Sequence, residues 1–158
     1  MFRPIRRSKR AIPDEEAQKL LLNEKRAVLA VNGDEGYPFA IPLNYIYDRE
    51  RAKIYFHGAK AGHKVDSLKK NDRVCFTVYG NEQRKEGDWA PYLQSVVVFG
   101  RCRLVEDAQL TEKKVRELAL KYYPSAQEVD AEMARDLKAV QLYEIEIEHM
   151  SGKQIHEK

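Results

Sequence analysis

Six strand-like runs, most of them joined by short turns, constrain the fold of this chain more than any other feature. The runs span residues 26–32, 37–48, 53–57, 73–80, 92–107 and 142–150. The last run contains LYEIEIEHM and is the clearest, because apolar and acidic residues alternate along it as in a strand with one buried face. Runs linked by turns pair antiparallel, and the regular strand and helix alternation of a parallel nucleotide-binding sheet is missing.

Helical patterns gather at the start of the chain and near its end. Pro13 and the acidic residues after it predict a first helix of about three turns. A short helix is expected over residues 62–71, a longer one over 107–122 that stops at Pro124, and another over 127–137. The sequence therefore predicts an α+β domain with a mostly antiparallel sheet or barrel.

Two prolines make the second run irregular. Pro38 and Pro42 cannot donate a backbone hydrogen bond, so they belong on a sheet edge or at a bulge. We expect the middle of this strand to lack some sheet partners. Gly100, inside the long fifth run, suits a bend or bulge of the kind found in small barrels.

Composition restricts the class of protein. The 158 residues, 43% of them hydrophobic and 34% charged, suit one globular domain over residues 1–158. No stretch approaches the roughly 20 apolar residues that a membrane helix needs, and the opening segment lacks the apolar core of a secretory signal. We expect a cytoplasmic protein with no membrane partner. Cys75 and Cys102 lie in apolar runs and are expected to be buried, reduced thiols.

The charge is uneven along the chain. The net charge is +3, and much of the excess lies in a basic N-terminal arm, residues 1–10. Such an arm could bind nucleic acid, but no recognition-helix pattern or aromatic stacking platform accompanies it. We therefore expect a solvated arm, no nucleic-acid partner, and a C-terminal tail over residues 151–158.

The stretch KIYFHGAKAGHK, residues 53–64, carries the chemistry. A strand ends at His57 and gives way to small and basic residues, with glycines just ahead of a predicted helix and Lys64 within its first turn. Glycines near a helix N-terminus let backbone N–H groups approach a phosphate, and a lysine supplies the countercharge. The pattern is neither a Walker loop nor a dinucleotide fingerprint, and alone it also suits an ordinary surface turn.

The sequence contains no clear motif for metal binding or for nucleophilic catalysis. His57 and His63 suggest a metal site, but no third ligand follows at a suitable spacing, and His149 and His156 lie near the C-terminus. Serines such as Ser67 have no nucleophile motif around them. We expect no metal, and the catalytic residues stay unknown.

The order of these pieces resembles the flavin-binding split-barrel proteins related to pyridoxamine 5'-phosphate oxidase, in particular the 5-nitroimidazole-resistance (Nim-type) branch. The resemblance is carried by GYPFAIPLNYIYD, KIYFHGAKAGHKVDSLKKNDRVCFTV and SVVVFGRCRLVED, and it runs from about residue 10 to residue 153. It implies a six-stranded antiparallel Greek-key split β-barrel with flanking helices, and a homodimer that holds FMN at the subunit interface.

The resemblance also implies a set of cofactor-binding residues. Pro42, Leu43, Asn44 and Tyr45 would line the flavin ring, although Tyr45 could equally be a barrel aromatic. The phosphate would be held by His57, Gly58, Ala59, Gly62, His63 and Lys64. Ser95 and Val96 would approach the cofactor from the second subunit.

The implied activity is reduction of a small electron-poor acceptor, such as the nitro group of a nitroimidazole, by an FMN-dependent oxidoreductase that uses NAD(P)H. The chain departs from the vitamin oxidases of the superfamily, because its phosphate loop has mainly Lys64 and its tail reads MSGKQIHEK, without their arginine-containing substrate element. Two alternatives stay open: a haem-binding or haem-degrading split barrel with His57 or His149 as the axial ligand, and a flavin-binding module without turnover.

Overall fold

The computed structural model describes residues 1–123 and 125–158; the predicted helix stop at Pro124 lies outside this range. Within it, seven strands form one sheet in the order β2-β1-β5-β6-β7-β4-β3, and every neighbouring pair is antiparallel. The strands are β1 (Ala27–Asn32), β2 (Pro38–Leu43), β3 (Ile46–Asp48), β4 (Lys53–Gly58), β5 (Arg73–Gln83), β6 (Tyr92–Val105) and β7 (Gln141–His156).

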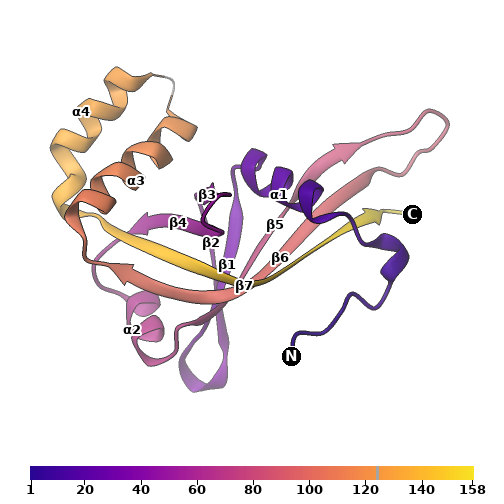
Figure 1. Cartoon of the computed structure of the whole chain (residues 1–158), viewed down its shortest axis with the longest axis horizontal. Helices are drawn as coiled ribbons and strands as arrows, with labels where there is room; N and C mark the ends of the chain where they lie inside the picture. Colours follow the sequence, from indigo (N-terminus) through magenta and orange to yellow (C-terminus); the bar gives the residue numbers. More distant parts are fainter. Residues whose placement is uncertain (124) are drawn as a thin grey trace.

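Four α-helices flank the sheet in the described part of the chain: α1 (Asp14–Asn23), α2 (His63–Lys70), α3 (Ala108–Tyr122) and α4 (Ala126–Asp136). They confirm the predicted helices to within a few residues. Helices α3 and α4 gather at one end of the sheet, and the β5–β6 hairpin projects from the other (Figure 1). Short 3₁₀ turns occur at Ser8–Arg10, Asp34–Gly36 and Leu137–Ala139. No helix in the described ranges is both long enough and apolar enough to cross a bilayer.

The α+β class and the antiparallel sheet are confirmed, but the predicted number of six strands is wrong, and the sheet of the expected split barrel is not closed. The run predicted as one strand over residues 37–48 is broken at Asn44 and Tyr45 into β2 and β3, which gives seven strands. These two strands are the opposite edges of the sheet, and no ladder joins them. Because two linking residues allow the strand ends a separation of only about 10 Å, the sheet must curl until its edges are neighbours. It is therefore a barrel left open between β2 and β3.

The prolines explain where the sheet stays open. Pro38 and Pro42 lie on β2, which pairs only with β1 and is an edge strand, as predicted. A proline on an edge removes a donor that no further strand could use. Gly100 also behaves as expected, since the register of β6 against β7 shifts between Phe99 and Gly100. A Cβ atom at Gly100 would lie 2.2 Å from the carbonyl oxygen of Glu146, so this bulge requires glycine.

Helix α3 holds the link between the two edges. The Tyr45 hydroxyl donates to the carbonyl of Leu21 at 2.7 Å, and the Tyr45 amide donates to the Tyr122 hydroxyl at 2.9 Å. The Lys121 Nζ donates to the carbonyl of Glu24 at 2.6 Å and lies 4.0 Å from the centre of the Tyr45 ring. The chain is thereby fixed to α1 and α3 at the point where it crosses from one sheet edge to the other.

Burying the Lys121 ammonium should make stability depend on pH. Burial lowers the pKa of Lys121 from 10.5 to about 8, so the unfolded chain holds this proton more tightly than the folded one. The free energy of unfolding should therefore rise with pH between about 8 and 10.5. We expect the wild type to gain stability relative to Lys121→Met across this interval, as measured by urea unfolding at several pH values. A difference between the two proteins that stays constant with pH would contradict the assignment.

Two long strands extend the sheet beyond the predicted bounds. Strand β5 continues to Gln83, into the segment expected to be a loop, and β7 continues to His156, through most of the segment expected to be a C-terminal tail. The ladder explains both, because β6 is long enough to pair with β5 as far as Gln83 and with β7 as far as His156. Residues 151–156 therefore belong to the sheet although their polar sequence lacks a strand pattern.

One face of the sheet carries an apolar surface, here called the outer face. Cross-strand neighbours on β1, β5 and β6 form it in two rows: Val28, Thr77 and Val97 in one, and Ala30, Cys75 and Phe99 in the other. None of these six residues is charged, and Val28 and Phe99 are 37% and 38% exposed. Cys75 was expected to be buried but is only partly buried, whereas Cys102 is buried as expected. The basic arm reaches this face, where the Phe2 ring stacks on Phe99 at 5.5 Å.

Candidate functional site

The loop between β4 and α2 is shaped by two glycines. Gly58 ends β4, and Gly62 caps α2 with a φ of 133°, a backbone conformation that residues with a side chain rarely adopt. Gly62 offers no capping side chain, so the first N–H groups of α2 have no capping partner. The Tyr143 hydroxyl, from β7, donates to the carbonyl of Ala59 at 2.7 Å and fixes the loop against the sheet. The result is a turn that is anchored to β7 and leaves the first N–H groups of α2 without a side-chain partner.

The Lys64 side chain folds back beneath this turn. Its Nζ lies 4.7 Å from the centre of the Tyr143 ring and 5.3 Å from that of Phe56. A Cβ atom at residue 58 would lie 2.8 Å from the same Nζ, so Gly58 makes room for the ammonium. No carboxylate of the described residues lies within ion-pair distance of it. Partial burial lowers the pKa of Lys64, and two aromatic faces alone balance the charge. An anion bound here would form an ion pair with the Lys64 ammonium group.

The second basic side chain of the loop is held by β2 and its turn. The His63 ring stacks on Phe39 at 4.0 Å, and its Nε2 lies 3.6 Å from Oδ2 of Asp34. His57 is exposed at the end of β4, and desolvation by its surroundings, followed by the Lys64 charge, lowers its pKa. His57 is therefore neutral at physiological pH and available as a hydrogen-bond partner.

A pocket of about 220 Å³ opens beside Lys64. Its apolar wall consists of Phe39 and Ile41 of β2 and the ring of Tyr143, and the loop residues close its other side. It offers an apolar surface ending in a cation and free amide donors, which suits an elongated ligand with a flat apolar part and an anionic end. In the part of the chain that the structure describes, no group of three His, Cys, Asp or Glu side chains could hold a metal ion.

Of the residues predicted to hold the phosphate, Ala59, Gly62, His63 and Lys64 line this pocket, and His57 and Gly58 do not. The six residues expected to hold the phosphate, His57, Gly58, Ala59, Gly62, His63 and Lys64, all lie on the β4–α2 loop or its two ends. Sequence reasoning missed Phe39 and Tyr143, which complete the site. Tyr143 could have been found, because its alternation with the glutamates already placed it on the buried face of β7.

The residues predicted to line the flavin ring differ in their exposure to solvent. Pro42 and Asn44 are exposed at the end of β2, and Leu43 is half buried against the core. The side chain of Tyr45 is fully buried in the core, and its hydroxyl donates a hydrogen bond to the carbonyl of Leu21.

The last predicted group lies far along β6. In the sheet, His57 of β4 pairs with Leu142 of β7, and Leu142 pairs with Val105 of β6. Ser95 lies ten residues before Val105 on β6, a distance of about 30 Å along the strand. The side chain of Ser95 is half buried on the same side of β6 as Val97, whereas the side chain of Val96 is fully buried in the core. Within one chain, Ser95 and Val96 therefore cannot reach the β4–α2 loop.

Comparison with known proteins places the chain in a family. The family model described as pyridoxamine 5'-phosphate oxidase matches residues 13–154, nearly the whole chain. The chain belongs to the pyridoxamine 5'-phosphate oxidase family. This confirms the resemblance carried by the proline-containing run, the β4–α2 loop and the long β6 strand. No curated protein matches the chain.

Solved structures of similar fold include flavoproteins by their names. A candidate 5-nitroimidazole antibiotic resistance protein from Bacteroides thetaiotaomicron is 18% identical, with a TM-score of 0.75 over 92% of this chain and 87% of its own. An FAD-binding protein from Mesorhizobium loti is 24% identical, with a TM-score of 0.67 over 92% and 97%. An FAD- and haem-binding protein from Mycobacterium smegmatis is 17% identical, with a TM-score of 0.70 over 89% and 70%. At these identities the likeness shows that this family member shares their fold.

Proposed function

We propose that the chain is an FMN-binding oxidoreductase that acts as a homodimer and passes electrons from NADH or NADPH to a small electron-poor acceptor such as an aromatic nitro group. The observation that carries the proposal is the Lys64 ammonium, which lies without a carboxylate partner beneath a glycine-framed turn. Membership of the pyridoxamine 5'-phosphate oxidase family and the FAD-binding neighbour support a flavin as the ligand. A single lysine with a few amide donors matches one terminal phosphate, which favours FMN over a dinucleotide.

The residues present suit this cofactor. Lys64 and the free N–H groups of α2 would take the phosphate, and Gly58 and Gly62 leave room for its approach. The apolar wall formed by Phe39 and Ile41 would lie along the rest of the molecule. Bound flavin would supply the hydride and electron transfer itself, so the protein has to orient the ring and exclude water.

A second copy of the chain is needed to complete such a site. The pocket of about 220 Å³ is smaller than the roughly 300–1,000 Å³ typical of sites for ligands of this size. Ser95 lies about 30 Å along β6 from Val105, which is level with the end of β4 in the sheet. It can therefore contribute to this site only from another subunit. The uncharged outer face, with Val28 and Phe99 more than a third exposed, is a suitable interface for that copy.

Steady-state kinetics under anaerobic conditions test the activity. The reconstituted protein should oxidise NADH or NADPH when a 5-nitroimidazole is added, since one hydride and one proton take a nitro group to a nitroso group and water. We also propose a role in turnover for His57, which is exposed at the end of β4 and can form hydrogen bonds with a bound acceptor. His57→Ala should lower turnover by about tenfold or more with flavin still bound.

Three results would separate the alternatives. Wild-type turnover in flavin-loaded His57→Ala would remove His57 from the proposal. Tight flavin binding with no nicotinamide-driven reduction of flavin or acceptor would favour a binding module without turnover. Iron-dependent absorption of a bound haem, as the name of one neighbour suggests for that protein, would replace the flavin proposal.

A further inference from the structure

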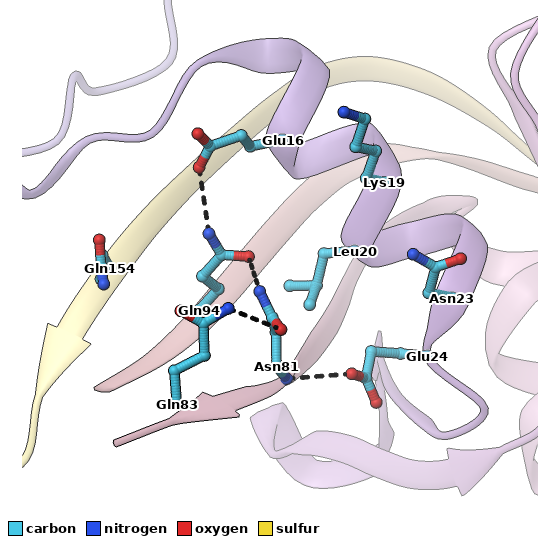
Figure 2. A pocket seen from close by; sticks show the side chains of 9 residues that line it. All are labelled: Glu16, Lys19, Leu20, Asn23, Glu24, Asn81, Gln83, Gln94 and Gln154. Carbon is cyan, nitrogen blue, oxygen red and sulfur yellow. Dashed lines mark hydrogen bonds between the residues drawn. The ribbon is translucent and has the colours of Figure 1, made fainter. Parts of the chain in front are cut away.

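A second pocket, of about 420 Å³, lies between α1 and the far ends of β5, β6 and β7 (Figure 2). Five of its lining side chains are carboxamides: Asn23, Asn81, Gln83, Gln94 and Gln154. None of them belongs to the β4–α2 loop or to the residues proposed to bind the flavin. So many side chains that both donate and accept hydrogen bonds, gathered around one hollow, call for a ligand with the same property.

Backbone irregularity shapes this pocket. The register of β5 against β6 shifts between Gly80 and Gln83, and Asn81 has a φ of 52°, in the left-handed region that asparagine tolerates. The Asn81 amide donates to Oε1 of Glu24 at 3.1 Å. A Cβ atom at Gly80 would lie 2.2 Å from the same oxygen, so glycine lets the carboxylate rest on the strand. Bulges of this kind re-aim side chains and are frequent beside binding sites.

Hydrogen bonds fix the orientation of the central amides. Oε1 of Gln94 accepts from Nδ2 of Asn81 at 3.0 Å, and Nε2 of Gln94 donates to Oε2 of Glu16 at 3.1 Å (Figure 2). The carboxamides of Asn23 and Gln154 make no hydrogen bond to any described residue, although both line the pocket. One part of the site is therefore preorganised, and another part has donors and acceptors left for a ligand.

The charge and apolar content of the pocket narrow the class of ligand. Glu16 and Glu24 outnumber Lys19, so the pocket is negative by one charge and disfavours a phosphate. No aromatic ring is among the side chains that line it, so a nucleobase would have nothing to stack on, and Leu20 supplies one small apolar surface. Adjacent hydroxyl groups match amide and carboxylate partners well, because each hydroxyl donates one hydrogen bond and accepts others.

We propose that this pocket binds a neutral polyhydroxylated small molecule, a sugar or a polyol. The proposal is independent of the flavin proposal. Gln94 projects from the same face of β6 as the buried Val96 and Val98, opposite to Ser95 and Val97 of the outer face. Pairing of two copies through the outer face would leave the pocket open.

NMR of ¹⁵N-labelled full-length protein tests the inference. D-ribose, D-glucose and sorbitol are titrated separately, with inorganic phosphate and putrescine as an anionic and a cationic probe. At least one of the three polyhydroxylated probes should shift the side-chain NH₂ signals of Asn23 and Gln154 saturably, and should bind more tightly than phosphate or putrescine. Gln154→Ala should weaken that binding by about tenfold, the value of one lost hydrogen bond.

A matched control and a second variant keep the test decisive. Gln127→Ala removes the same group from an exposed position on α4 and should bind like the wild type. If Gln154→Ala disturbs the fold, as its backbone spectrum would show, Asn23→Ala on α1 replaces it. The proposal fails if none of the three polyhydroxylated probes shifts these signals, if phosphate or putrescine binds more tightly, or if a folded variant binds like the wild type.

Discussion

Lys64→Ala should lower the affinity of the protein for FMN by about 10- to 100-fold. The ammonium lies 4.7 Å from the centre of the Tyr143 ring with no carboxylate partner among the described residues, so a bound phosphate would form its first ion pair. A hydrogen bond to a charged group contributes about 1.5–3 kcal/mol, which is 10- to 100-fold in a dissociation constant. The folded state should not suffer, because the substitution also removes a partly buried charge whose pKa burial already lowers.

Flavin fluorescence during titration of the apoprotein measures this effect. The control is Lys60→Ala, which removes an exposed lysine from the same loop and leaves the turn unchanged. We expect Lys60→Ala to change the dissociation constant less than twofold, and Lys64→Arg to keep part of the affinity through its charge. Equal losses in Lys64→Ala and Lys60→Ala would mean that the loop attracts phosphate only by its overall charge. No loss in either would show that Lys64 does not hold the phosphate.

Val97→Glu should separate the two subunits of the proposed dimer and release the flavin with them. Val97 lies on the outer face, between Thr77 and Ser151 of the neighbouring strands. In a symmetric dimer both copies would bring a carboxylate to the interface, and each buried charge costs several kcal/mol. We expect the dissociation constant of the dimer to rise by about 1,000-fold or more.

Sedimentation at several protein concentrations measures this change as a shift from the mass of two chains to that of one. Leu120→Glu is the control, because Leu120 is 42% exposed on α3, away from the outer face. That variant should keep the mass and the flavin content of the wild type. A Val97→Glu protein that stays dimeric would place the interface elsewhere, and a monomeric wild type would overturn the proposed assembly.

Much of the fold follows from local patterns in the sequence. The alternation in LYEIEIEHM, the prolines of β2 and the acidic start of α1 each correspond to the element that they predict. The break at Asn44 and Tyr45 could not be predicted in this way, because the side chains of Tyr122 and Lys121, far along the chain, hold it in place. The polar end of β7 was missed for a similar reason, since its strand structure comes from pairing with β6 and not from its own residues.

In the candidate site, too, local features could be predicted from the sequence and contacts between distant residues could not. Glycine and lysine spacing was enough to predict the glycine-containing turn before α2 and the position of Lys64 in the first turn of that helix, because the residues of such a turn are contiguous. The sequence could not reveal that Tyr143 and Phe39, from β7 and β2, form the wall of the pocket. It also could not reveal that Tyr45 is fully buried, since an aromatic beside a proline-containing strand suits the core as well as a ligand.

The absorption spectrum of the protein purified without added cofactor tests most directly whether the β4–α2 loop binds the phosphate of FMN. We expect the bands of an oxidised flavin, and we expect the released compound to be identified as FMN by mass. A colourless protein that also fails to take up added FMN would contradict the claim, as would a bound haem or the release of FAD alone.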